Sequence, residues 1–171
     1  TFKITTGFSM KHYFLLMFFF FAAAGISGQS HKIDSLKQII RLHRSDTATC
    51  MAYANLCRSY ERSYPDSALY FGQEGMKLSK KLHYQRGEIQ NAIYISRVYD
   101  KIGNFTTSMQ LLVEYKERAE KIGDYSLVAS ALSNLGWIYS SQGDLKNELS
   151  YFRQSRSEEH TSELQSRVDI S

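Results

Sequence analysis

The chain has 171 residues, which is enough for one domain with a targeting segment. Its 21 Lys and Arg against 17 Asp and Glu give a net charge of +4, too small and too scattered to indicate nucleic-acid binding. One Pro, ten scattered Gly and two Cys exclude a collagen-like or Pro-rich chain, a disulfide scaffold and a Cys-rich zinc module. Aromatic residues make up 13% of the chain, so a disordered composition is also excluded, and we expect a mostly helical globular protein.

The N-terminal region has the pattern of a secretory signal peptide over residues 10–28. A basic start is followed by a 12-residue apolar run over residues 13–24 and then by small residues, with cleavage expected after Ala24 or Gly28. The alternative is a membrane anchor, but a spanning helix needs about 20 apolar residues. No Cys follows the run, which argues against a lipoprotein anchor. Residues 1–9 are then expected to be translated sequence upstream of the true start.

A leading amphipathic helix is expected over residues 31–45. Its apolar positions recur at helical spacing, and they are Ile33, Leu36, Ile39, Ile40 and Leu42. We expect this helix to cover the exposed end of the helices that follow.

Three segments then repeat a large aliphatic residue, a small residue and, three positions later, a tyrosine. These positions are Leu56, Cys57 and Tyr60, then Ile95, Ser96 and Tyr99, then Leu135, Gly136 and Tyr139. The aliphatic positions lie 39 and then 40 residues apart, which indicates an internal repeat. The small residue lets two helices approach closely, and the tyrosine lies on the same helical face. Each segment therefore predicts the first helix of a helix hairpin.

Turn signals divide this region into six predicted helices. Gly103-Asn104 and Gly143-Asp144 each place a Gly past the end of one helix and a capping residue before the next, and Pro65 suits a first helical turn. The predicted helices cover about residues 47–62, 65–82, 85–102, 104–122, 125–142 and 144–155. Each hairpin has an apolar stripe that it cannot bury alone, so we expect neighbouring hairpins to stack. The three hairpins cover residues 46–83, 84–123 and 124–155.

This pattern resembles the tetratricopeptide repeat over about residues 46–155. The third copy has the residues typical of the family at Leu135, Gly136, Tyr139, Gly143 and Phe152, and it departs from the family pattern at Glu148 and Ser155. The second copy has Ser96 where the family has Gly, Ser108 where it has Ala and Leu112 where it has an aromatic residue. The first copy has a shorter turn, followed by Ala68. The resemblance implies an all-α, right-handed superhelix of antiparallel helix hairpins with about three repeats. The usual repeat has 34 residues, and this longer one resembles the variant found in bacterial sensor and regulator proteins.

The C-terminal residues 156–171 break the apolar rhythm, and residues 156–166 resemble the translation of a common sequencing-adapter oligonucleotide. We therefore exclude this tail from the predicted fold and expect the natural protein to continue differently after Ser155. The alternative is a genuine polar C-terminal helix.

Catalytic and metal-binding patterns are not found. The five His, at positions 12, 31, 43, 83 and 160, form no helical pair, and no glycine-rich phosphate loop occurs. Cys50 and Cys57 lie seven residues apart on one predicted helix, about 10 Å and beyond disulfide reach, so we expect them to pack as small core residues. We expect no enzyme, metal or cofactor in this region, although a kinase could follow it in the full-length protein.

The resemblance implies that the first helices of successive hairpins line a concave groove. The groove residues would be Asn55, Arg58, Arg62, Tyr94, Arg97, Lys101, Asn134, Trp137 and Ser141. Arg suits carboxylates, Asn can hold a peptide backbone and the aromatic residues are anchors, so an extended acidic or C-terminal peptide is expected. As exposed charges, the arginines are expected to add little to stability. The alternatives are an ordinary solvated helix face and, for Trp137, packing against a following helix.

Two functions follow from this layout. The first is an exported, extracytoplasmic interaction module that binds a peptide or a partner protein. The second is the N-terminal sensory region of a bacterial sensor histidine kinase or helix-turn-helix regulator, which the signal peptide and the long repeats resemble. In those proteins the repeats precede a membrane helix and a cytoplasmic output domain, so downstream sequence distinguishes the two.

Overall fold

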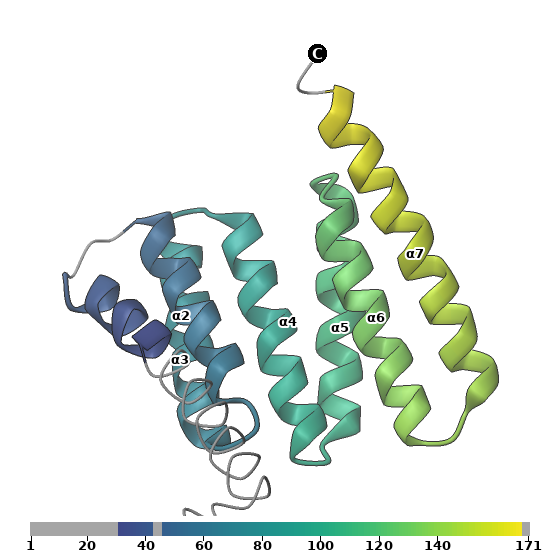
Figure 1. Cartoon of the computed structure of the whole chain (residues 1–171), viewed down its shortest axis with the longest axis horizontal. Coiled ribbons are helices and arrows are strands. Elements are labelled where there is room, and N and C mark those ends of the chain that lie inside the picture. The colour runs from purple at the N-terminus through teal and green to yellow at the C-terminus, as the bar shows by residue number, and fades with distance from the viewer. Residues whose placement is uncertain (1–30, 43–45, 169–171) are drawn as a thin grey trace, which may run out of the picture.

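The computed structural model describes residues 31–42 and 46–168, and every regular element in them is a helix (Figure 1). The predicted all-α class is confirmed. A helix over residues 31–41 is followed by α2 (Thr47–Tyr60), α3 (Pro65–Lys81), α4 (Gln85–Lys101), α5 (Phe105–Lys121), α6 (Tyr125–Ser141) and α7 (Leu145–Val168). The predicted signal peptide and the residues before it lie outside the described residues.

The last five helices begin 20 residues apart, which sets the 40-residue repeat of the hairpins. Three of the four turns between them contain a glycine in the left-handed region, with φ of +80° at Gly103, +69° at Gly123 and +75° at Gly143. His83 takes the same place in the remaining turn with φ of +52°. A left-handed residue ends a helix by turning the chain out of it, so these positions fix the helix ends.

The residue after each glycine caps the next helix, as predicted. Asn104 accepts a hydrogen bond from the backbone N–H of Thr107 at 3.2 Å. Asp144 accepts one from the backbone N–H of Asn147 at 3.1 Å, which lowers the pKa of this carboxyl group. These bonds satisfy N–H groups that have no partner within the helix.

The predicted end of the last helix at Ser155 is wrong, because α7 continues to Val168. The 20-residue period places the next left-handed turn residue at Glu163 and the next cap at Leu164. Neither residue suits its place, since a left-handed backbone favours glycine and leucine cannot cap. Ser155 is the only buried residue of α7, so the extension adds little packing.

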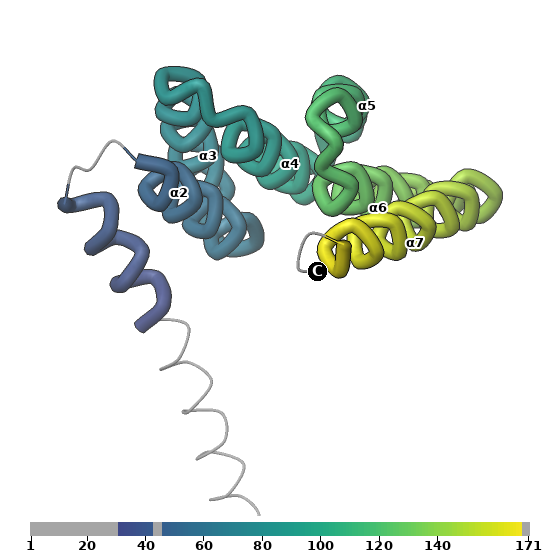
Figure 2. The backbone as a smooth tube through the Cα atoms, turned by 90° about the horizontal axis from the view of Figure 1, so that it is seen from above, coloured from purple at the N-terminus to yellow at the C-terminus, as the bar shows by residue number. Residues whose placement is uncertain are grey.

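The first helices of the hairpins form a continuous row. Helix α4 packs against α2 on one side and α6 on the other, whereas α3 and α5 meet only at side-chain level in the part of the chain described, where Tyr115 Oη lies 3.8 Å from Met76 Sδ. Figure 2 shows α3 and α5 together on one side of this row and α7 against α6. The row places the ends of α2, α4 and α6 on one shared surface, although the right-handed superhelix itself stays a prediction.

The core consists of two clusters that each combine three successive helices. One joins α4, α5 and α6 around Ile89, Leu112 and Leu135, and the other joins α2, α3 and α4 around Cys57 and Ile95. The hairpins therefore stack, as their apolar stripes predicted. Both cysteines are free and buried, as predicted, and burial raises the pKa of the Cys57 thiol to about 12.

Close approach between helices depends on residues without large side chains. A Cβ atom at Gly72 would lie 2.6 Å from Ile95 Cγ1, and one at Gly136 would lie 3.0 Å from the Phe152 ring. In the second hairpin, Ser108 Oγ donates to the backbone oxygen of Ser96 at 2.7 Å. The predicted close-approach role of Gly136 is thus confirmed.

The helix over residues 31–41 lies beside the first hairpin (Figure 1). Its Lys37 Nζ is 5.8 Å from the centre of the Tyr60 ring of α2. Its isoleucines are only half-buried and Leu42 is exposed, so the end of the first hairpin is partly covered. No helix within residues 31–42 and 46–168 is long and apolar enough to cross a membrane.

A buried ionic cluster joins α3, α4 and α5. Glu88 of α4 is buried, and its Oε1 accepts from Arg118 Nη1 at 2.7 Å and from Tyr115 Oη at 3.3 Å. Lys80 Nζ of α3 lies 3.8 Å from the same oxygen. Burial, followed by the charge of Glu88, raises the pKa of Tyr115 to about 12.

The Gly136→Leu substitution is expected to lower the free energy of unfolding by about 1–3 kcal/mol, because the side chain would overlap the Phe152 ring. Thermal and urea denaturation followed by circular dichroism measure this loss. Ser141→Leu places the same side chain at an exposed position of α6 and is the control. Equal stability of the two variants would contradict the packing.

The raised pKa of Tyr115 predicts a loss of stability at alkaline pH. The folded state holds this proton more tightly than the unfolded state, so the stabilisation is complete below about pH 10 and is lost as the pH rises towards 12. Tyr115→Phe should therefore show a smaller fall in unfolding free energy between pH 8 and about pH 11.5. Tyr70→Phe, at an exposed tyrosine, is the control, and identical pH profiles for parent and Tyr115→Phe would refute the assignment.

Candidate binding groove

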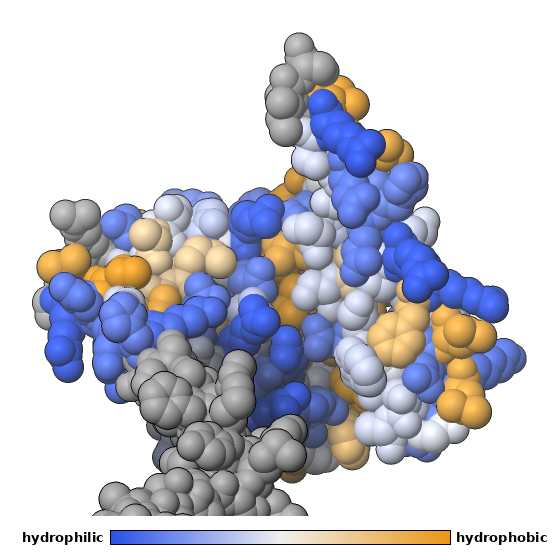
Figure 3. Space-filling view, in the orientation of Figure 1, coloured by the Kyte–Doolittle hydropathy of each residue, from blue (hydrophilic) through white to orange (hydrophobic). Residues whose placement is uncertain are grey.

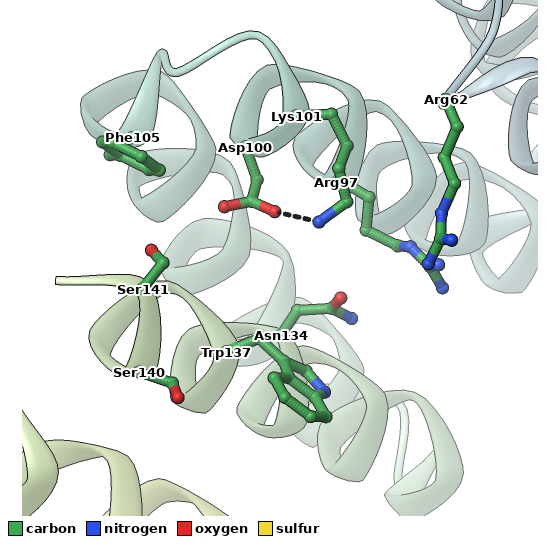
Figure 4. A pocket seen from close by; sticks show the side chains of 9 residues that line it. All are labelled: Arg62, Arg97, Asp100, Lys101, Phe105, Asn134, Trp137, Ser140 and Ser141. Carbon is green, nitrogen blue, oxygen red and sulfur yellow. Dashed lines mark hydrogen bonds and ion pairs between the residues drawn. The ribbon is translucent and has the colours of Figure 1, made fainter. Parts of the chain in front are cut away.

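A pocket of about 690 Å³ opens on the row of first helices (Figure 4). Its lining residues are Arg62, Arg97, Asp100, Lys101, Phe105, Asn134, Trp137, Ser140 and Ser141. They come from the residues after α2, from the C-terminal half of α4, from the start of α5 and from α6. We call this pocket the groove; its volume is within the usual range for ligand sites.

The structure brings together six of the nine residues predicted for this surface. These are Arg62, Arg97, Lys101, Asn134, Trp137 and Ser141. The other three do not line the pocket: Asn55 is half-buried on α2, Arg58 is exposed on α2, and Tyr94 is half-buried on α4. Whether the six bind a ligand stays a prediction.

Arg97 is not the ordinary exposed charge that the sequence predicted. Its Nη2 lies 2.6 Å from Oε1 of Glu61, whose side chain is 7% exposed, and the guanidinium carbon is 5.9 Å from the centre of the Tyr94 ring. Glu61 ends α2 and Arg97 belongs to α4, so this ion pair joins two hairpins. Oε2 of Glu61 is buried without a hydrogen bond, so the carboxylate depends on Arg97.

Neighbouring carboxylates neutralise part of the positive charge of the groove. Lys101 Nζ lies 2.8 Å from Asp100 Oδ2, so two of the three cations have an acidic partner. Arg62 forms no ion pair within the described part of the chain. Figure 4 shows the guanidinium groups of Arg62 and Arg97 together at one end of the pocket. This end therefore carries a net positive charge.

Trp137 is the most exposed apolar side chain of the groove. Its side chain is 62% exposed, and its ring meets the Phe152 ring edge to face with centres 5.3 Å apart. Beside it, Asn134 Nδ2 donates to the backbone oxygen of Ser130 at 2.7 Å, which fixes the amide. The groove thus offers a supported aromatic surface, an oriented amide and a cationic end.

Sequence reasoning missed Glu61, Asp100 and Ser140, although they share one position of the repeat, directly after each repeated tyrosine. This position follows Arg58, Arg97 and Trp137 by three residues, and residues three apart share a helical face. The repeat phase could therefore have identified it. Phe105 had no such signal, because the turn before α5 brings it to the pocket.

Metal binding receives no support from the described part of the chain. No group of three or more His, Cys, Asp or Glu side chains there is arranged to hold a metal ion. The three described histidines, His31, His83 and His160, are all exposed.

No family model matches the chain, and no curated protein or solved structure matches it either. The likeness to the tetratricopeptide repeat therefore rests on the residues quoted above, and the ligand chemistry rests on the groove.

Arg97→Ala should lower the free energy of unfolding by about 1–3 kcal/mol, because it leaves the buried Glu61 carboxylate without its partner. Urea denaturation of Arg97→Ala, Glu61→Gln and the double variant measures the coupling. We expect the double variant to be more stable than the sum of the single losses. Arg58→Ala is the control and should change the free energy of unfolding by less than about 0.5 kcal/mol. If the losses in unfolding free energy of Arg97→Ala and Glu61→Gln simply add in the double variant, the two side chains are not coupled.

Proposed function

We propose that this chain is an interaction module of the tetratricopeptide type, and that its groove binds an extended segment of a partner protein. The observation that carries the proposal is the pocket that combines the cationic end at Arg62 and Arg97 with the exposed, Phe152-supported ring of Trp137. Stacked hairpins with a 40-residue period and the close contact at Gly136 support the family assignment.

The chemistry of the groove favours an acidic segment with an apolar side chain. A carboxylate would sit at the Arg62 end, because Arg62 has no acidic partner among the described residues while Arg97 already pairs with Glu61. An aromatic or aliphatic side chain would cover Trp137, since exposed tryptophans often anchor partners. Asn134 would hold the peptide backbone between these two points. An acidic internal segment or a peptide C-terminus has this chemistry.

Export from the cytoplasm is the part of the proposal that rests on sequence alone, through the signal-peptide pattern of residues 10–28. The alternative is the sensory region of a bacterial sensor histidine kinase or regulator. It is favoured by a signal-peptide pattern that stands before long repeats. Both assignments give the groove the same ligand chemistry. They differ in whether occupation of the groove changes the activity of a linked output domain.

A titration with acidic peptides tests the groove. Peptides of about ten residues, selected by phage display with free C-termini, are titrated against the chain by calorimetry. Arg62→Ala should weaken binding by about 1.5–3 kcal/mol, as expected for a hydrogen bond to a charged group, and Trp137→Ala by at least about 2 kcal/mol. Neither change should alter stability much, because both side chains are exposed.

Arg58→Ala is the matched control for this titration, since Arg58 is an exposed arginine of α2 outside the groove. Replacing the carboxylates of the selected peptide with amides should cause a loss similar to that of Arg62→Ala. If Arg62→Ala and Trp137→Ala bind like the parent chain, the groove is not the binding site.

A further inference from the structure

Glu61 is a buried carboxylate beside the groove, although it is not one of the lining residues. Its side chain is 7% exposed, and its Oε1 lies 2.6 Å from Nη2 of Arg97, which does line the groove. Its Oε2 is buried without a hydrogen bond, so the charge of this carboxylate is offset chiefly by Arg97. The pair therefore keeps a negative charge close to any anion that enters the cationic end of the groove.

Glu61 changes what the cationic end can offer to a ligand. Arg97 donates one of its N–H groups to Glu61, and its other N–H groups can still donate to an anion. The positive charge of Arg97, however, is offset by the carboxylate beside it. Arg62 is exposed and forms no ion pair within the described part of the chain, so it supplies the charge that is not offset. This end consequently has the hydrogen-bond donors of two arginines but the net charge of about one.

The rest of the groove adds no cation without an acidic partner. Lys101 Nζ lies 2.8 Å from Asp100 Oδ2, and the other lining residues are uncharged. Figure 3 shows hydrophilic surface over the C-terminal half of α4, the part of the helix to which Arg97, Asp100 and Lys101 belong. The hydrophilic character of this surface thus comes from paired charges of both signs rather than from a basic patch.

We propose that Glu61 restricts the groove to ligands with a single negative charge at the cationic end, a carboxylate rather than a phosphate or two adjacent carboxylates. The inference rests on the proposed function, because it concerns the ligand of the same groove. One carboxylate neutralises the charge of Arg62 and accepts hydrogen bonds from both guanidinium groups. A second negative charge would find no cation without a partner, would be repelled by Glu61 and would lose part of its hydration.

Peptides that differ only in charge test this inference on the parent chain. The probes are end-blocked peptides of glycine and serine that carry one leucine or phenylalanine and one anionic residue at varied spacing. Each peptide is made with glutamate, γ-carboxyglutamate or phosphoserine, and the last two carry close to two negative charges near neutral pH. The peptides contain no tryptophan, so the emission of Trp137, the only tryptophan of the chain, reports binding in the groove. We expect neither doubly charged version to bind more than about threefold tighter than the glutamate version.

Glu61→Gln removes the negative charge and keeps an acceptor for Arg97. The ratio of phosphoserine-peptide affinity to glutamate-peptide affinity should then rise by at least about fivefold, because the charge of Arg97 is no longer offset. A purely structural role of Glu61 would weaken all versions alike and leave this ratio unchanged. Glu117→Gln, at an exposed carboxylate of α5 outside the groove, makes the same change in net charge and is the matched control. Circular dichroism checks that each variant is folded, and the comparison on the parent chain carries the test if Glu61→Gln is not.

Two results would overturn this inference and leave the proposed function standing. The first is a doubly charged peptide that binds the parent chain more than about threefold tighter than its glutamate version. The second is an unchanged affinity ratio in a folded Glu61→Gln variant. A different result, no saturable change of tryptophan emission with any version up to a concentration on the order of 1 mM, would overturn the proposed function and this inference with it.

Discussion

The close approach of neighbouring helices at small residues is the constraint on which the rest of the structure depends. Gly72 admits Ile95 and Cys57, Ser96 accepts a bond from Ser108, and Gly136 admits Phe152. A larger side chain at any of these places would push two backbones apart, because protein interiors have no spare volume. The contacts at Ser96 and Gly136 close the second and third hairpins, whereas Gly72 also brings α3 against Ile95 of α4 and so joins the first hairpin to the second.

The groove opens where an interaction between hairpins fails to repeat. Glu61 of the first hairpin pairs with Arg97 of the second, which closes the interval between α2 and α4. The corresponding residues one step later are Asp100 and Trp137, and an indole cannot form an ion pair with a carboxylate. Asp100 instead pairs with Lys101 beside it, and Trp137 turns its ring to Phe152. The interval between α4 and α6 therefore stays open to a ligand.

Helix boundaries were predictable because local chemistry sets them. Gly and Asn or Asp at Gly103-Asn104 and Gly143-Asp144 end one helix and cap the next without help from distant residues. The end at Ser155 was mispredicted for the same reason, because loss of apolar rhythm changes burial but does not stop a helix. The groove was partly predictable from repeat phase, whereas the pairing of Arg97 with Glu61 joins residues 36 positions apart, and no spacing rule reveals it. From the first hairpin only Arg62, directly after Glu61, reaches the groove, whereas Asn55 and Arg58 lie earlier on α2 and do not line it.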